Sequence, residues 1–315
     1  MEPVPVVRPD ALREGDCIGL AAPASPFQEA ALHEGIEVLQ NMGFRVRYEP
    51  RVFERFRYLA GHDAERAAEL QTLFADPDIK AIFCCRGGYG SQRLLPFLDA
   101  GAIRANPKLF MGYSDLTSLL CYLGTCCGLA TLHGPVVCGD LRRELGAAAR
   151  RQLIGVLTGD LEAMQPPPAC QEALTVLHAG DAEGRLLGGC LSVFACAIGT
   201  PFQPRTQDAI LFLEDKGERL YAIDRLLTTL KLSGLLQGVR GLVFGHFERV
   251  EADAHLSYDA RDVILDVLDG LDVPVLYGFP SGHCSQPLIL PFGVEAAIRD
   301  GRLILCESPV TRRNG

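Results

Sequence analysis

The chain has 315 residues, of which 48% are hydrophobic, so it can bury a sizeable core, and the usual domain size of about 100–200 residues predicts two domains. Its 30 basic and 39 acidic residues give a formal net charge of -9, which disfavours a nucleic-acid or anionic-membrane surface and favours a small-molecule or peptide substrate. Residues 1–16 are charged, with no apolar segment, and no stretch reaches the roughly 20 apolar residues that span a bilayer. We therefore expect a cytoplasmic protein.

Strands and helices alternate in the first half of the chain. Residues 17–22 read as a strand, and Ser25-Pro26 then opens a helix that Gly43 closes. Residues 44–48 read as a second strand, Asp63 caps a second helix, and residues 79–85 form the next strand. This order predicts an open, mainly parallel sheet flanked by helices, with ligands bound beyond the carboxyl ends of the strands.

A glycine-rich loop, Arg86-Gly87-Gly88-Tyr89-Gly90-Ser91, follows the last of these strands. Nucleotide binding is weakly supported, because the third glycine of G-x-G-x-x-G is missing and no Gly-Lys-Ser/Thr follows. The loop is either a tight turn without a ligand or a source of backbone amides for an oxyanion. We favour the second interpretation because Ser114 is predicted nearby.

Ser114 lies where the hydrophobic period changes from that of a strand to that of a helix. Residues 108–111 are a short, mostly apolar run, and leucines recur at helical spacing from Leu116 onwards. A serine at such a turn is either a nucleophile or a helix N-cap. The G-x-S-x-G pattern is broken by Leu116, so the local sequence alone leaves both interpretations open.

The alternation of predicted strands and helices weakens at about residues 146–183. After it, the sequence predicts short strands, a helix and a terminal hairpin. Residues 209–213 form a strand that ends at Glu214-Asp215, residues 220–230 form a helix, and Asp300-Gly301 joins a terminal hairpin. We expect an α/β domain at 1–150, a linker region at 151–183 and a smaller β-rich domain at 184–315.

The twelve cysteines are spread along the chain, mostly in apolar runs, and we expect reduced core thiols. No metal site is predicted, because Cys126, Cys127, His133 and Cys138 lack both a C-x-x-C pair and a zinc-like spacing. Three histidines are candidates for a general base, and spacing alone cannot choose among them: His133, His246 and His283.

Six motifs occur in the order found in LD-carboxypeptidases, a family of serine peptidases that also includes the microcin-immunity peptidases. They are Tyr58-Leu59-Ala60-Gly61, Arg86-Gly87-Gly88-Tyr89-Gly90, Gly112-Tyr113-Ser114-Asp115, His133-Gly134-Pro135, Phe212-Leu213-Glu214-Asp215, and Gly282-His283 followed by Leu290-Pro291-Phe292-Gly293. The chain resembles this family over nearly its whole length.

The resemblance implies a catalytic triad between the α/β domain and a C-terminal domain that contains a β-barrel. Carried over by motif, Ser114 is the nucleophile, His283 the base and Glu214 the orienting acid. Gly88 and Asp115 are our candidates for the oxyanion hole, and Arg86 is a candidate partner for a substrate carboxylate. No metal or organic cofactor is required.

The resemblance also implies a substrate, a murein tetrapeptide that is cut between meso-diaminopimelate and the terminal D-Ala during cell-wall recycling, and a homodimer. In the related immunity enzymes the substrate is a peptidyl nucleotide whose base stacks on a tryptophan, and this chain has none. One departure is Cys190, which stands where the family usually has asparagine. It alters either substrate preference or only packing.

Two other classes of function remain as alternatives. A class I glutaminase would need a cysteine at the exposed turn, whereas Cys84 and Cys85 lie in a predicted strand. A peptide-binding module without catalysis would keep the cleft and need no acyl transfer.

Overall fold

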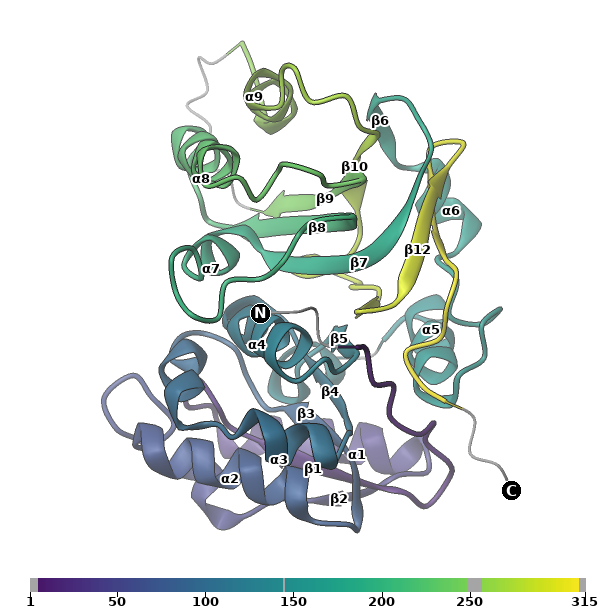
Figure 1. Cartoon of the computed structure of the whole chain (residues 1–315). Coiled ribbons are helices and arrows are strands. Elements are labelled where there is room, and N and C mark those ends of the chain that lie inside the picture. Colours follow the sequence, from purple (N-terminus) through teal and green to yellow (C-terminus); the bar gives the residue numbers. More distant parts are fainter. Residues whose placement is uncertain (1–4, 144, 249–256, 312–315) are drawn as a thin grey trace.

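The computed structural model describes residues 5–143, 145–248 and 257–311. Its two halves, each built on one sheet, are stacked in Figure 1. The N-terminal half carries five parallel strands in the order β5-β4-β3-β1-β2. These are β1 (Cys17–Ala21), β2 (Arg45–Arg47), β3 (Ile79–Cys84), β4 (Leu109–Gly112) and β5 (Thr131–His133). Every residue of β1 is buried, as expected for a strand with both faces covered.

Helices connect these strands; the first begins later than the sequence indicated, and the second begins one residue earlier. They are α1 (Glu29–Asn41), α2 (Asp63–Ala75), α3 (Ala100–Ala105) and α4 (Thr117–Cys126). Ser25 does not cap α1, because its Oγ accepts a hydrogen bond from the backbone N–H of Tyr89 at 3.1 Å. Asp63 is the first residue of α2 rather than its cap, and its carboxylate binds Arg66 and Arg93.

The C-terminal sheet has seven strands in the order β13-β12-β7-β8-β9-β10-β6. Four central strands are parallel: β7 (Ala182–Cys190), β8 (Ala209–Lys216), β9 (Gly241–Glu248) and β10 (Val275–Phe279). The antiparallel strands at the edges are β6 (Thr175–His178), β12 (Glu295–Arg299) and β13 (Arg302–Leu305).

This sheet curls, so that Gly301, in the turn between β12 and β13, lies against Val176 of β6. Asp300 and Gly301 have φ of 50° and 71°, the conformation that the predicted hairpin turn requires. Three helices cover the sheet around a separate apolar cluster: α7 (Leu191–Ala195), α8 (Leu220–Leu232) and α9 (Ala260–Val267). The α/β fold class is confirmed. The β-barrel that the resemblance implied for the C-terminal domain is a curled, half-closed sheet, because its edge strands β6 and β13 do not pair with each other.

A strand from the C-terminal half extends the N-terminal sheet. β11 (Leu290–Phe292) pairs antiparallel with β5, so that Leu290 lies opposite His133. One buried apolar cluster runs through both halves and includes residues of both sheets. The two sheets are therefore fixed to each other at the place where β5 and β11 meet.

Residues 151–183, expected to be a linker, contain the rest of α5 (Ala147–Thr158), then α6 (Pro168–Glu172) and β6. Gln152 of α5 is buried and holds both backbone groups of Ile289, accepting from its N–H at 2.7 Å and donating to its carbonyl at 3.1 Å. How the chain divides into domains stays a prediction.

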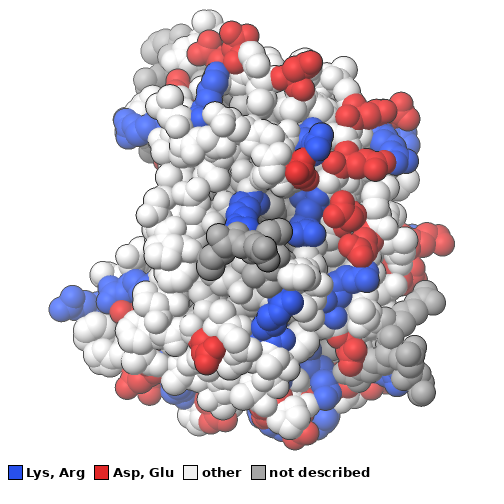
Figure 2. Space-filling view, viewed as in Figure 1, with Lys and Arg blue, Asp and Glu red and all other residues white. Residues whose placement is uncertain are grey.

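Acidic and basic side chains are interspersed on the face shown in Figure 2. Within the described ranges, no helix is both long and apolar enough to cross a membrane. All twelve cysteines are free, and most are buried, in agreement with their expected role as core thiols.

Candidate active site

Ser114 lies in a sharp turn between β4 and α4. A single 3-10 turn, η3 (Ser114–Leu116), leads from the strand to the helix. Ser114 has a φ of 65°, in a region that residues other than glycine rarely adopt. A Cβ at Gly112 would lie 2.3 Å from Cδ1 of Leu116, so glycine is what allows the tight turn. Strained strand-to-helix turns of this kind expose nucleophilic serines in other α/β enzymes.

The hydroxyl of Ser114 does not cap a helix. Tyr113 occupies the N-cap position of η3, and Oγ of Ser114 lies 3.1 Å from Nε2 of His283 instead. The geometry thus favours the nucleophile interpretation over the cap.

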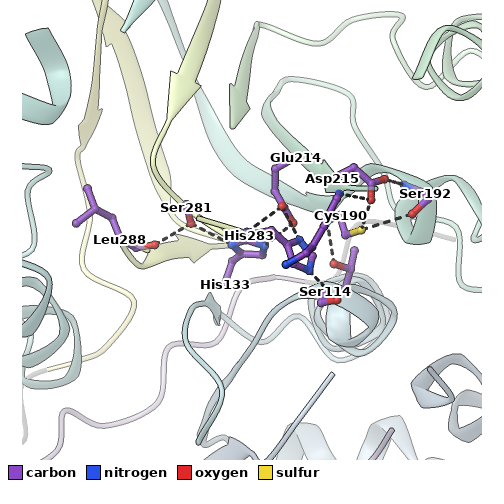
Figure 3. Close-up of polar contacts among 11 residues, drawn as sticks. Ser114, His133, Cys190, Ser192, Glu214, Asp215, Ser281, His283 and Leu288 are labelled. Atoms are coloured by element: carbon purple, nitrogen blue, oxygen red, sulfur yellow. Dashed lines mark hydrogen bonds and ion pairs between the residues drawn. The ribbon is translucent and has the colours of Figure 1, made fainter. Parts of the chain in front are cut away.

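His283 follows β10 in a loop and links Ser114 to Glu214 (Figure 3). Its Nδ1 lies 2.8 Å from Oε2 of Glu214, and its backbone N–H donates to the same oxygen at 3.1 Å. Because a carboxylate only accepts hydrogen bonds, Nδ1 carries the proton in this arrangement. Nε2 of the neutral ring is then free to accept the proton of Ser114.

Glu214 lies in β8 with its side chain fully buried, whereas the side chain of His283 is 13% exposed. Two glycines make room for the carboxylate. A Cβ at Gly282 would lie 2.4 Å from Cδ of Glu214, and one at Gly245 would lie 2.7 Å from its Cβ. Gly282 immediately precedes His283, so the histidine loop can approach the acid closely only because this residue is glycine.

The charge on Glu214 is stabilised inside the protein. Burial by itself would raise its pKa, but interactions with His133 and His283 outweigh burial and lower the pKa to about 2. For His283, burial favours the neutral ring, yet the Glu214 carboxylate raises its pKa above the usual histidine value. The acid is therefore ionised, and the base titrates above its ordinary range.

The glycine loop packs directly against the serine. A Cβ at Gly87 would lie 3.4 Å from Oγ of Ser114. Gly88 has a φ of 100°, and a Cβ there would lie 2.4 Å from Oγ of Ser25. Its backbone N–H has no acceptor among the described residues. This free amide beside the serine fits the predicted oxyanion donor.

Asp115 ties the serine turn to that loop. Its buried carboxylate accepts from the backbone N–H of Ser91 at 2.8 Å, and its carbonyl accepts from Oγ of Ser91 at 2.6 Å. Burial raises the pKa of Asp115, and the hydrogen bonds from Ser91 and Gly90 oppose that shift. Asp115 also lies at the start of η3, where backbone amides have no partner within the helix.

Two other candidates lie around this centre without joining the hydrogen-bond chain. Arg86 is exposed, and its guanidinium donates to the carbonyl of Pro26 at 2.5 Å. Cys190 is buried; its backbone N–H donates to Oγ1 of Thr117 at 3.0 Å, and its Sγ lies 3.3 Å from Oδ1 of Asp215. Cys190 therefore sits between the serine helix and the strand of the acid.

The other candidate bases do not contact Ser114. His246 is exposed on β9, and His133 is buried on the far side of Glu214, 3.8 Å from Oε1. Sequence reasoning missed Tyr113, whose ring packs edge-on against His283 with centroids 5.0 Å apart; its place beside Ser114 was the available signal. Within the described ranges, no group of three or more His, Cys, Asp or Glu residues could hold a metal ion.

A serine, a histidine and a buried carboxylate in hydrogen-bond sequence define the class of serine hydrolases. Two family models match the chain: the LD-carboxypeptidase N-terminal domain at residues 18–134 and the LD-carboxypeptidase C-terminal domain at residues 183–298.

Named relatives agree with these matches. The chain is 36% identical to the probable murein peptide carboxypeptidase of Bacillus subtilis, over 92% of this chain and 91% of the relative. It is 32% identical to the murein tetrapeptide carboxypeptidase of Pseudomonas aeruginosa, over 91% and 94%. A solved structure of the microcin C7 self-immunity protein MccF superposes with a TM-score of 0.87 at 30% identity, covering 96% of this chain and 99% of that one.

The chain belongs to the LD-carboxypeptidase family of serine peptidases. The resemblance found in its motifs is thereby confirmed.

Proposed function

We propose that the protein hydrolyses the L,D-amide bond of murein tetrapeptide and releases the terminal D-Ala in cell-wall recycling. The observation that carries this proposal is the unbroken chain from Oγ of Ser114 through His283 to Glu214. The substrate comes from relatives named as murein peptide and murein tetrapeptide carboxypeptidases.

In the proposed mechanism, His283 accepts the Ser114 proton on Nε2 as Oγ attacks the carbonyl carbon of the scissile amide. Glu214 keeps the other ring proton on Nδ1 and stabilises the imidazolium that forms. His283 then protonates the leaving amine of D-Ala, which departs as the C–N bond breaks and leaves an acyl ester on Ser114. Water attacks that ester with His283 as base, the acyl–oxygen bond breaks, and the serine is regenerated.

The backbone amides of Gly88 and Asp115 are proposed to stabilise the oxyanion of both tetrahedral intermediates. The free amide of Gly88, which follows the Gly87 that packs against Ser114, supports this role. A single donor of this type typically contributes about 3–4 kcal/mol to transition-state stabilisation.

Arg86 is proposed to bind the terminal carboxylate of the substrate. It is exposed, it borders the glycine loop, and a guanidinium binds a carboxylate through two parallel hydrogen bonds. Its bond to the Pro26 carbonyl would orient the side chain before the substrate arrives.

A peptidyl nucleotide is the competing substrate, favoured by the close structural likeness to MccF. The absence of tryptophan from the chain weighs against it, because the immunity enzymes stack a base on that residue. A tyrosine or phenylalanine would have to take its place.

The substrate is tested by incubating the protein with murein tetrapeptide, its D,D-linked counterpart and a peptidyl nucleotide, and identifying the products by mass spectrometry. We expect free D-Ala from the L,D-linked tetrapeptide and much slower cleavage of the other two. Faster cleavage of the nucleotide would assign the protein to the immunity type, and no cleavage of any would favour a binding module. We also propose a cytoplasmic homodimer, which light scattering of the purified protein tests for subunit number.

A further inference from the structure

The second carboxylate oxygen of Glu214 has a partner that the proposed triad does not use. Oε2 accepts both hydrogen bonds from His283, whereas Oε1 is buried and accepts none among the described residues. Nε2 of His133 lies 3.8 Å from Oε1, and within the described ranges this nitrogen also has no hydrogen-bond partner. Both side chains are fully buried. A buried carboxylate oxygen and a ring nitrogen thus face each other, and neither accepts a hydrogen bond from, or donates one to, any residue that the structure describes.

The hydrogen bonds of Ser281 determine where the first proton of His133 lies. Oγ of Ser281 is 2.7 Å from the carbonyl oxygen of Leu288 and 3.1 Å from Nδ1 of His133 (Figure 3). A carbonyl cannot donate, so the single hydroxyl proton must point to Leu288. Oγ can then only accept from His133, and Nδ1 must carry a proton.

The second ring nitrogen faces a negative charge. If His133 held only the Nδ1 proton, the lone pair of Nε2 would point at the ionised Oε1 of Glu214 between two fully buried side chains, and neither atom would gain a hydrogen bond from the other. A proton on Nε2 turns this repulsion into an ion pair. The 3.8 Å separation is too long for a strong hydrogen bond but within the range of a charge pair.

We propose that His133 is a positioning residue which carries both ring protons and pairs, as an imidazolium, with the second oxygen of Glu214. This inference rests on the proposed function of Glu214 as the acid of the triad. The resting centre then holds one negative and one positive charge, so His283 can stay neutral and act as a base. Aromatic rings fix the orientation of His133: Phe212 and Phe292 lie with centroids 5.3 and 5.4 Å from its own.

Other titratable groups close to Glu214 and its two histidines do not replace His133 in this role. Burial raises the pKa of Tyr113, Cys190 and Cys284, which keeps these groups neutral. Asp215 accepts hydrogen bonds from the backbone of Ser192 and Lys216. Two further charged groups act on this centre: Lys216 acts on His283, and Asp140 acts on Tyr113.

The protonation state can be observed directly in the resting enzyme. We would label the seven histidines with 15N and record the ring nitrogens across the pH range of activity, identifying His133 by its absence from the spectrum of His133→Asn or by elimination. We expect two protonated nitrogens on His133 throughout. A ring with a single proton would overturn the proposal. The measurement needs no substrate, so its outcome is independent of whether the protein releases D-Ala.

The catalytic consequence is tested with His133→Phe and His133→Asn, which both remove the charge. Phe keeps the aromatic packing, and Asn keeps a donor toward Ser281. Losing a positive charge beside Glu214 should raise the acid limb of the kcat/KM profile by about one pH unit in both variants. At pH values below the limb, kcat/KM of the variants should then be about tenfold lower than that of the unaltered enzyme, and at pH values above the limb it should be largely retained. If His133 had a purely structural role, the acid limb would stay in place and the Asn variant would keep the activity that the Phe variant loses; that result would contradict the proposal. If neither variant folds, the 15N spectrum of the unaltered enzyme decides.

Discussion

At the scale of single residues, the proposed chemistry depends on one proton that passes from Oγ of Ser114 to Nε2 of His283, two atoms that lie 3.1 Å apart. The proton can move only while His283 is neutral. Glu214 raises the pKa of His283 despite burial, so the fraction of neutral base falls at a higher pH than it would for a free histidine.

The pH dependence of the reaction follows from that shift. Activity requires the deprotonated ring, so we expect kcat/KM to fall as the pH drops through a value above about 6.5, the ordinary pKa of histidine. Steady-state rates of D-Ala release between mildly acidic and alkaline pH would show the limb. A limb well below 6.5 would contradict the ionised Glu214 described here.

Replacing the acid should move the limb in the opposite direction to replacing His133. Glu214→Gln keeps the volume and removes the negative charge, so the pKa of His283 should fall and the acid limb should move to lower pH. The rate at the plateau should decrease by about 10⁴-fold, because nothing then favours the imidazolium or the correct tautomer. Rate profiles of the variant measure both effects. An unchanged limb would show that Glu214 does not act on the base.

Arg86 can be tested for its proposed contact with the substrate carboxylate. Arg86→Ala should raise KM about tenfold or more, the equivalent of a lost charged hydrogen bond, with a smaller change in kcat. The matched control is Arg240→Ala, which removes an exposed arginine paired with Asp208. Equal KM values for both variants and the unaltered enzyme would show that Arg86 does not bind the substrate carboxylate.

Motifs were sufficient to bring Ser114, Glu214 and His283 together as candidates, and the structure places these three side chains within hydrogen-bonding distance. The geometry of Ser114 was not predictable, because its positive φ belongs to a turn in which Gly112 packs against Leu116 and Ser114 packs against Gly87 of the glycine loop. Spacing did not choose among His133, His246 and His283; the motif resemblance selected His283, and the fold supplies the physical reason for that choice. All three lie on or after strands, and only the pairing of those strands decides which one reaches Ser114.

At the scale of elements, the glycine loop and the serine turn form one unit, joined by Ser91 and Asp115. The sequence predicted the loop but placed Ser25 in a helix cap, because Ser-Pro is a common helix start. In the structure Ser25 braces the loop instead, through the N–H of Tyr89.

A methyl group at Gly88 should disturb this unit. Gly88→Ala would be strained at a φ of 100° and would press against Oγ of Ser25, so the loop must shift and withdraw its amide. We expect a loss of about 10²–10³-fold in kcat with a smaller change in KM.

The matched control is Gly124→Ala in α4, where an added Cβ has no atom within 4 Å. This variant should keep its activity and gain about 0.5–1 kcal/mol in the free energy of unfolding. Full activity of Gly88→Ala would argue against a role for the loop amide in catalysis.

At the scale of the whole molecule, the site lies between two sheets, and the C-terminal half of the chain contributes strand β11 to the N-terminal sheet. β11 was not predicted as a strand of the N-terminal sheet. Its three residues include Pro291, which sequence rules admit only at a sheet edge, and β11 is indeed the edge strand. Such a short strand is defined by its long-range partner β5, which no local pattern reveals.

Breaking the link between α5 and the β11 segment should destabilise the molecule. Gln152→Ala would leave the buried N–H and carbonyl of Ile289 unpaired, which we expect to cost about 2–4 kcal/mol in the free energy of unfolding. Urea denaturation measures the change. The exposed Gln40→Ala in α1 is the control and should stay within about 0.5 kcal/mol. A negligible effect of Gln152→Ala would mean that the two halves are not held together at this position.

The central claim is that Ser114 attacks the L,D-amide bond of murein tetrapeptide, and the time course of free D-Ala with the unaltered protein and with Ser114→Ala tests it most directly. We predict steady release by the unaltered protein and a rate at least about 10⁴-fold lower in the variant, while its unfolding curve stays close to that of the unaltered protein. Undiminished release by Ser114→Ala would contradict the account.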